Sequence, residues 1–154
     1  MVSRDNGPEG LRVTAFCDRG DVALVFEAER LRTHGRATGF LHVNLFRHAV
    51  FEEVSICVVH PGGWPELERF FAASELRDPV YFDTVTVRFK DREIVVRRGE
   101  WRSGRFVFVT EGLMDGDEPR VIPAGTALGV ASGELTLLYA GHAAPIVLLT
   151  ESMQ

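Results

Sequence analysis

The stretch Thr84-Val-Thr-Val-Arg-Phe89 alternates polar and apolar residues with a period of two, which is typical of a β-strand with one buried face. The same alternation recurs from Leu11 to Glu151, and only one stretch, Trp64–Leu76, has the periodicity of a helix. The fold is therefore predicted to be mainly β. We expect a single-domain β-barrel or two-sheet β-sandwich of about nine to eleven strands, with one flanking α-helix near residues 64–76.

The expected helix has an apolar stripe at positions i, i+3 and i+4, formed by Leu67, Phe70 and Phe71. Pro65 suits its first turn, and an Asp-Pro pair just beyond residue 76 ends it. Leu67 and Phe70 are predicted to be buried against the β-structure.

Length and composition are those of one ordinary globular domain, with 154 residues, 45% hydrophobic and 25% charged. Residues 1–10 are predicted to be a polar N-terminal arm and residues 11–154 a single β domain. No apolar run approaches 18 residues, and the N-terminus lacks the apolar core of a signal peptide. We expect no membrane partner, and a location in the cytoplasm or in an intracellularly assembled particle.

Two cysteines, Cys17 and Cys57, lie in apolar strand-like runs without CxxC spacing. They are predicted to be buried free thiols rather than a disulfide, a metal site or a nucleophile. No three good metal ligands have a convincing spacing, so no metal and no cofactor are expected.

The segment from Arg88 to Arg105 holds seven basic and three acidic residues, a net charge of +4, which leaves −9 on the rest of a chain whose total is −5. A basic hairpin on an acidic body predicts association with an acidic surface, on a second copy or on another protein. The arginines assigned to this interaction are Arg88, Arg92, Arg97, Arg98, Arg102 and Arg105. Aromatic residues interleave them, as in single-strand binders, but the strand period turns Phe89 inward and the total charge is negative, which disfavours nucleic acid.

A polar cluster offers a different interpretation. His42 and Asn44 share one face of a strand expected at residues 39–46, while His48 and Glu52 are expected beyond its end, and residues 30–38 form a polar loop. In a small-molecule-binding barrel, His42 is the candidate acid or base. A plain hydrogen-bonded pair on a half-buried or surface face remains the simpler alternative.

The segment Val121-Ile-Pro-Ala-Gly-Thr-Ala-Leu-Gly129 resembles fragments of two protein families. One is the second conserved segment of cupins, in which Pro-x-Gly precedes a metal-binding histidine; here Leu128 stands in that place. The other is the Ile-Pro-Ala-Gly-Thr-x-Leu-Gly segment of small phage head-decoration proteins, which also precedes a β-hairpin and a terminal strand. The second resemblance implies a structural subunit of a phage particle, and neither fragment assigns the chain to a family.

Two functions follow from these patterns. The first is a non-enzymatic, self-associating structural or interaction protein, a component of a phage or phage-like particle, with a strand near residues 145–149 adding apolar contact. The alternative is a small-molecule-binding β-barrel, a cofactor-free isomerase or cyclase, with His42, Asn44 and Tyr81 or Tyr139 in its mouth. A filled interior favours the first function and a hollow one favours the second.

Overall fold

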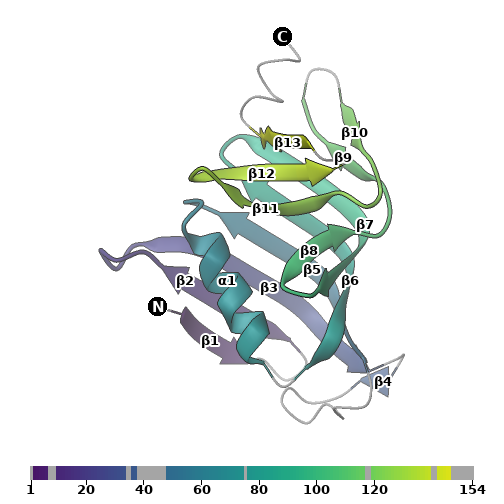
Figure 1. Ribbon diagram of the computed structural model, residues 1–154. Helices are drawn as coiled ribbons and strands as arrows, with labels where there is room; N and C mark the ends of the chain where they lie inside the picture. Colours follow the sequence, from purple (N-terminus) through teal and green to yellow (C-terminus); the bar gives the residue numbers. More distant parts are fainter. Residues whose placement is uncertain are drawn as a thin grey trace.

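The protein is described by a computed structural model that covers residues 2–6, 10–33, 36–37, 48–74, 76–116, 119–139 and 142–146. Over these residues the protein is mainly β, with one helix, as the alternation predicts (Figure 1). Its strands are β1 (Val2–Asn6), β2 (Leu11–Phe16), β3 (Val22–Thr33), β4 (Arg36–Ala37), β5 (His48–Val58), β6 (Arg77–Phe89), β7 (Arg92–Arg102), β8 (Arg105–Phe108), β9 (Gly112–Met114), β10 (Arg120–Ile122), β11 (Ala127–Ala131), β12 (Glu134–Tyr139) and β13 (His142–Pro145).

All these strands belong to one mixed sheet, whose main path runs β1-β2-β3-β5-β6-β7-β8-β11-β12-β13. Off this path, β4 pairs with β3, β9 with β7, and β10 with β9. Every described pair is antiparallel except β5 with β6. Parallel neighbours need a crossover connection, and the helix α1 (Gly63–Ala73) supplies it.

The helix α1 lies against the inner face of the sheet and buries Trp64, Leu67 and Phe71. The prediction for Leu67 is confirmed, but the one for Phe70 is wrong, because Phe70 is only partly buried and Phe71 takes the inward position. Gly63 allows the helix to approach β3 closely, since a Cβ atom there would lie 2.6 Å from the Cβ of Leu24.

Aromatic rings fill the space between the helix and the sheet. The rings in mutual contact are Phe26, Phe51, Phe71, Phe82, Trp64, Trp101, Phe106 and Phe108. Phe51 stacks on Phe82 with centroids 5.8 Å apart, and Trp64 meets the ring of Phe106 at 6.2 Å. The core is therefore solid around these side chains, and it joins α1 to β8 as well as to β3, β5 and β6.

The predicted barrel is wrong, because the sheet is not closed over the described residues. The predicted two-sheet sandwich is wrong as well, because the described strands are hydrogen-bonded into one sheet. The sheet instead curls, so that α1 has contacts with β1, β2 and β3 and also with β11 (Figure 1). Over the described residues, one sheet thus covers both sides of the helix, and its first and last strands do not pair with each other.

A row of extra residues crosses four neighbouring strands and bends the sheet. In each strand two outward residues, instead of one, separate consecutive buried residues. These buried pairs are Ala28 and Leu31, Phe51 and Val54, Phe82 and Val85, and Val96 and Gly99. Because all four strands carry the extra residue at the same level, their pairing keeps its register on both sides.

We call the extra residues Glu29, Glu53, Thr84 and Arg97 the kink row. Glu53 and Thr84 have positive φ angles, 52° and 59°, in the left-handed region that non-glycine residues disfavour. An extra residue of this kind bends a strand and re-aims its side chains. Next to the row, β7 changes partner from β9 at residues 94–96 to β8 at residues 99–102, so the sheet also forks here.

Several expected boundaries differ from the structure. The predicted loop at residues 30–38 is wrong at residues 30–33, because β3 continues to Thr33 and pairs with β5, and at residues 36–37, which form β4 and pair with β3. His48 and Glu52 were expected outside a strand and lie in β5. The β6–β7 turn is Lys90–Asp91. The strand expected at 39–46, with His42 and Asn44, lies outside the described residues.

Candidate functional site

A hollow of about 500 Å³ opens on the outer face of the sheet beside the kink row. It is lined by Arg32, Val50, Glu52, Tyr81, Asp83, Arg98 and Val109. These residues come from β3, β5, β6, β7 and the chain just after β8, so the curved sheet itself is the floor of the hollow.

Strand register places three charged lining residues, Glu52, Asp83 and Arg98, in one row with Arg30, which lies beside the lining. Arg30 of β3 pairs with Glu52 of β5, Glu52 with Asp83 of β6, and Asp83 with Arg98 of β7. The two carboxylates thus occupy the middle of the row and the two guanidinium groups its ends. Arg32 lies on the next row outward from the kink, beside Val50 and Tyr81.

Ion pairs already connect these charges. Glu52 lies between two arginines: the Nε of Arg30 is 3.8 Å from Oε2, and the Nε of Arg32 contacts Oε1. The Nε of Arg98 donates to Oδ1 of Asp83 at 3.2 Å. The side chain of Glu52 is 17% exposed, against 38% for Asp83 and 57% for Arg98, so the β6–β7 side of the hollow is the more accessible one.

The kink row holds this arrangement. Glu53 and Thr84, with their strained backbone, directly follow the lining residues Glu52 and Asp83. Beyond the row, the backbone N–H of Arg98 donates to Oγ1 of Thr110, and its carbonyl accepts from the N–H of Val109 at 3.0 Å. Backbone strain of this kind clusters at functional sites, and here it coincides with the charged hollow.

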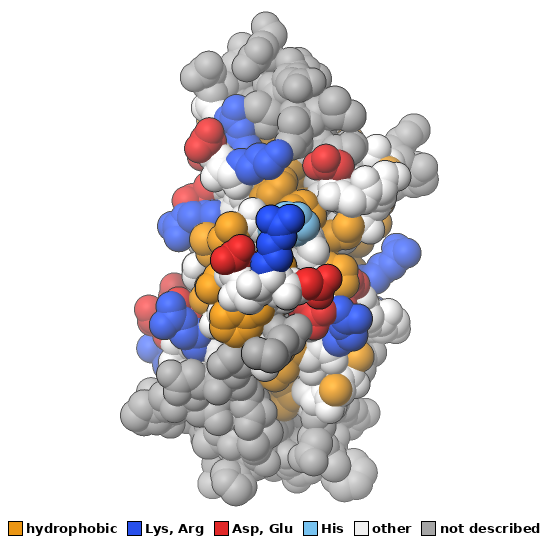
Figure 2. Space-filling view, turned by 90° about the vertical axis from the view of Figure 1, so that its left-hand side faces the viewer, with side chains coloured by type: hydrophobic (Ala, Val, Ile, Leu, Met, Phe, Trp, Pro, Cys, Tyr) orange, Lys and Arg blue, Asp and Glu red, His pale blue; other side chains and the backbone are white. Residues whose placement is uncertain are grey.

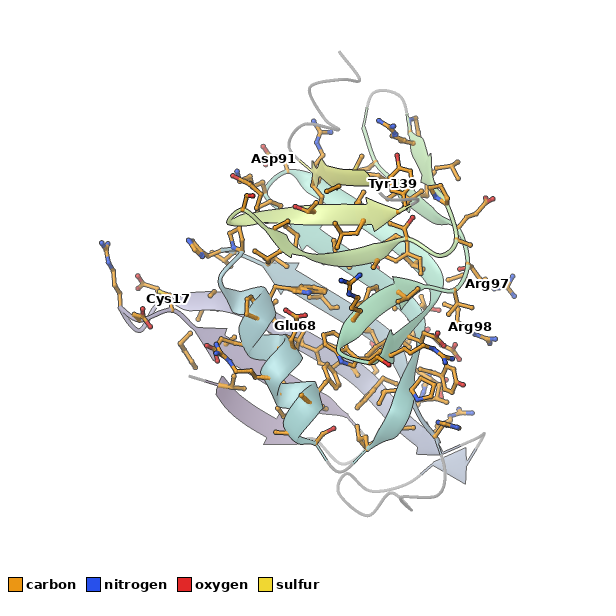
Figure 3. The ribbon with its side chains drawn as sticks, viewed as in Figure 1. Cys17, Glu68, Asp91, Arg97, Arg98 and Tyr139 are labelled. Carbon is orange, nitrogen blue, oxygen red and sulfur yellow. The ribbon has the colours of Figure 1, made fainter. Side chains whose placement is uncertain are left out.

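The polar residues selected from the sequence do not all meet here. Tyr81 lines the hollow and packs edge-on against His48, with ring centroids 5.5 Å apart. His48 Nδ1 is 3.0 Å from the carbonyl oxygen of Pro79. Tyr139 lies on β12, separated from β6 by three strands, and Figure 3 shows it at the other end of the molecule from the α1–β6 connection. His42 and Asn44 lie outside the described residues.

A second feature on the outer face is an apolar row across β7, β9 and β10. Val95 pairs directly with Leu113, and Leu113 with Val121. These residues are 41%, 50% and 57% exposed, which is high for branched aliphatic side chains that lie side by side. We call Val95, Leu113 and Val121 the apolar row.

The six arginines of the basic segment spread along the length of β7 and its neighbours. Three of them face carboxylates of the same chain: Arg88 with Glu93 at 2.9 Å, Arg98 with Asp83, and Arg102 with Glu100 at 2.8 Å. Arg97 and Arg105 are exposed, and Arg92 is half-buried. In Figure 3, Arg97 and Arg98 lie on the right-hand side, whereas Asp91 of the same segment lies at the upper left.

Both cysteines are free thiols, but the predicted burial is wrong, because Cys57 is exposed and Cys17 half-buried.

The described residues contain no group of three His, Cys, Asp or Glu side chains that would hold a metal ion. In the same part of the chain, no helix has the length and hydropathy needed to cross a membrane.

On α1, burial raises the pKa of Glu68, and the nearby charge of Arg105 opposes that shift. The side chain projects from the helix beneath β11 in Figure 3. Figure 2, which shows the left-hand side of Figure 1, has basic, acidic and hydrophobic side chains interspersed. No surface of one charge stands out among the described residues of that side.

The sequence contains a signal for the hollow that inspection of each strand by itself does not reveal. Two adjacent polar residues interrupt the alternation in each of four strands: Glu29-Arg30, Glu52-Glu53, Asp83-Thr84 and Arg97-Arg98.

No family model, curated protein or solved structure matches the chain. Its function is therefore inferred from the residues and their geometry alone.

Proposed function

We propose that this protein is a non-enzymatic, self-associating structural or interaction protein, and that the apolar row is the centre of its contact with a second copy. The exposure of Val95, Leu113 and Val121 carries the proposal. Removing these side chains from water contributes favourably to association, whereas leaving them exposed contributes nothing to folding.

The position of the row supports a second copy as the occupant. Val121 lies on β10, which among the described residues pairs only with β9, so its other edge is open to a further strand. A stable interface buries roughly 800 Å² on each partner, more than three side chains provide. A second copy would therefore also cover the β10 edge and the charged residues around the row.

The arginines supply orientation in this proposal. Arg97 is exposed two residues after Val95 on β7, and the rest of the chain is acidic. Opposite charges around an apolar centre favour one relative orientation and raise the association rate more than the affinity. An acidic surface on a different protein would meet the same arrangement.

The solid aromatic core supports this function over the alternative barrel. Phe26, Phe51 and Phe82 occupy the inner face where a ligand would enter such a barrel. The alternative isomerase or cyclase was expected to have Tyr81 at its pocket, and Tyr81 does line a hollow, but this hollow lies on the outer face of the sheet rather than inside a barrel, and His42 and Asn44 lie outside the described residues. The assignment to a phage or phage-like particle rests on the resemblance of residues 121–129 and stays a prediction.

Light scattering of the wild type and of Leu113→Lys tests the proposal. We expect an oligomer for the wild type and a shift toward monomer for Leu113→Lys, because a lysine in the middle of the row would be desolvated in the interface. Val59→Lys is the matched control, since Val59 is 62% exposed at the end of β5, outside the row. Val121→Lys is a second variant at the open strand, and circular dichroism verifies folding.

A wild type that stays monomeric at high concentration would contradict self-association. An oligomer that resists Leu113→Lys and Val121→Lys would keep the association but place its interface elsewhere.

A further inference from the structure

We propose that the hollow beside the kink row binds a small zwitterion with an apolar side chain, a free amino acid being the simplest example. The proposal goes beyond self-association and assigns a ligand class to residues on β3, β5, β6 and β7. It rests on three complementary parts of the hollow: a carboxylate pair, an accessible guanidinium group and an apolar wall.

The carboxylate pair is the place for an ammonium group. Glu52 and Asp83 are register partners on adjacent strands, so their attachment points are about 4.8 Å apart on the same face. Like charges directly beside each other on a sheet repel. Arg30 and Arg32 pair with Glu52 from the β3 side and Arg98 pairs with Asp83 from the β7 side, and an ammonium group placed between the two carboxylates would be attracted by both.

The guanidinium group of Arg98 is the place for a carboxylate. Its hydrogen bond to Asp83 runs through Nε, and the side chain is 57% exposed. The planar guanidinium group has five N–H donors, and its terminal nitrogens form the paired hydrogen bonds that carboxylates accept. Because Arg98 adjoins Asp83 in the row, one small molecule can reach both groups when it carries both charges close together.

The apolar wall is the place for the side chain of the ligand. Val50, Tyr81 and Val109 line the same hollow as the charged residues, and Val109 is 41% exposed. A volume of about 500 Å³ lies in the usual range for small-molecule sites, which combine apolar walls with a few placed polar groups. The lining residues Arg32, Glu52, Asp83 and Arg98 carry charges of both signs, which suits a ligand that carries both.

The strained backbone is an independent observation in favour of a built site. Glu53 and Thr84 hold left-handed conformations at the same level of two adjacent strands, immediately after the two carboxylates. Such conformations persist only where the surrounding structure enforces them, and they cluster at binding and catalytic sites.

Binding is measured by NMR titration and calorimetry with three probes that share a phenyl group: L-phenylalanine, 3-phenylpropionate, which lacks the ammonium group, and 2-phenylethylamine, which lacks the carboxylate. We expect L-phenylalanine to bind at least tenfold more tightly than either singly charged probe, because each loses one set of charge-assisted hydrogen bonds. Glycine, which lacks the apolar part, is expected to bind more weakly than L-phenylalanine.

Two arginines provide a matched pair of variants. Arg98→Gln should reduce L-phenylalanine affinity at least tenfold, whereas Arg19→Gln, which makes the same change at an exposed position in the β2–β3 turn outside the lining, should leave it within twofold. Asp83→Asn should abolish the preference of the protein for L-phenylalanine over 3-phenylpropionate. Thermal unfolding verifies that each variant is folded, and Arg32→Gln replaces Arg98→Gln should the latter not fold.

Equal binding of the amine and the zwitterion would overturn the proposal, as would equal effects of Arg19→Gln and Arg98→Gln, or no binding by 10 mM ligand (a limit of roughly −2.7 kcal/mol). The titrations are repeated with Leu113→Lys. Zwitterion binding that survives in a monomeric Leu113→Lys variant separates the hollow from self-association, so either proposal can fail alone.

Discussion

Thr84 holds a left-handed conformation inside β6, although its β-branched side chain strongly disfavours positive φ. We expect Thr84→Gly to raise the free energy of unfolding by about 1 kcal/mol, because glycine adopts this conformation without steric cost. Thr86→Gly is the matched control two residues along the strand, and it should lower that free energy by about 1 kcal/mol. Chemical denaturation measures both, and a destabilised Thr84→Gly variant would contradict the account of strain.

Phe71 and Phe70 are adjacent, but their side chains have different roles. Phe71 is 5% exposed and its ring centroid lies 4.9 Å from that of Trp101, whereas Phe70 is only partly buried. Phe71→Ala is expected to cost about 3–5 kcal/mol of unfolding free energy, and Phe70→Ala about half as much or less. Equal losses in chemical denaturation would mean that the helix faces the sheet differently.

Glu68 makes the free energy of unfolding depend on pH. Because burial raises its pKa in the native state above the ordinary value of 4.5, the native protein binds more protons than the unfolded chain as pH rises from that value. The contribution of Glu68 therefore favours folding at low pH and is lost as pH rises toward the raised pKa.

Glu68→Gln should flatten the dependence of unfolding free energy on pH in this window. Arg105→Gln should steepen it, because the charge of Arg105 opposes the effect of burial. Urea denaturation at a series of pH values measures the slope, and an unchanged slope in Glu68→Gln would assign it to other groups.

At the level of elements, the periodicity of short segments predicted the features that depend on those segments alone. The helix predicted at residues 64–76 follows from the Leu67 stripe and lies within a few residues of the observed ends, and the alternation of residues 84–89 correctly predicts the strand β6. The hollow was missed because Glu52-Glu53 and Asp83-Thr84 look like the ends or interruptions of strands. They read as one site only when four strands lie side by side, and strand pairing is not encoded in any one segment.

The same dependence on strand pairing explains why residues 30–33 were predicted to be a loop although they belong to β3. Residues 30–33 are polar enough to suggest a loop, since Arg30 and Arg32 are charged. In the structure they continue the strand because Glu52 of β5 lies between them and compensates both. Tertiary pairing thus overrides local composition here, as it commonly does for strands.

For the whole molecule, the choice between barrel, sandwich and single curled sheet depends on contacts between distant segments. Alternation specifies that each strand has one buried face, and all three architectures satisfy that requirement. The kink row and the aromatic core select the curled sheet, because the bend brings β8 and β11 over the same helix that β2 and β3 cover. Closure is then unnecessary for burying α1.

Charge reversal at Arg97 tests how two copies of the molecule associate. If Arg97 faces an acidic surface of a second copy, Arg97→Glu should weaken association several-fold at low ionic strength, because repulsion replaces attraction. The difference from the wild type should shrink at high salt, where exposed charges more than a few ångströms apart are screened. Arg19→Glu, at an exposed position in the β2–β3 turn, makes the same change of charge elsewhere and should have little effect. Light scattering at low and high salt measures all three proteins. An equal effect of the two reversals would show that total charge, rather than a defined contact at Arg97, controls association.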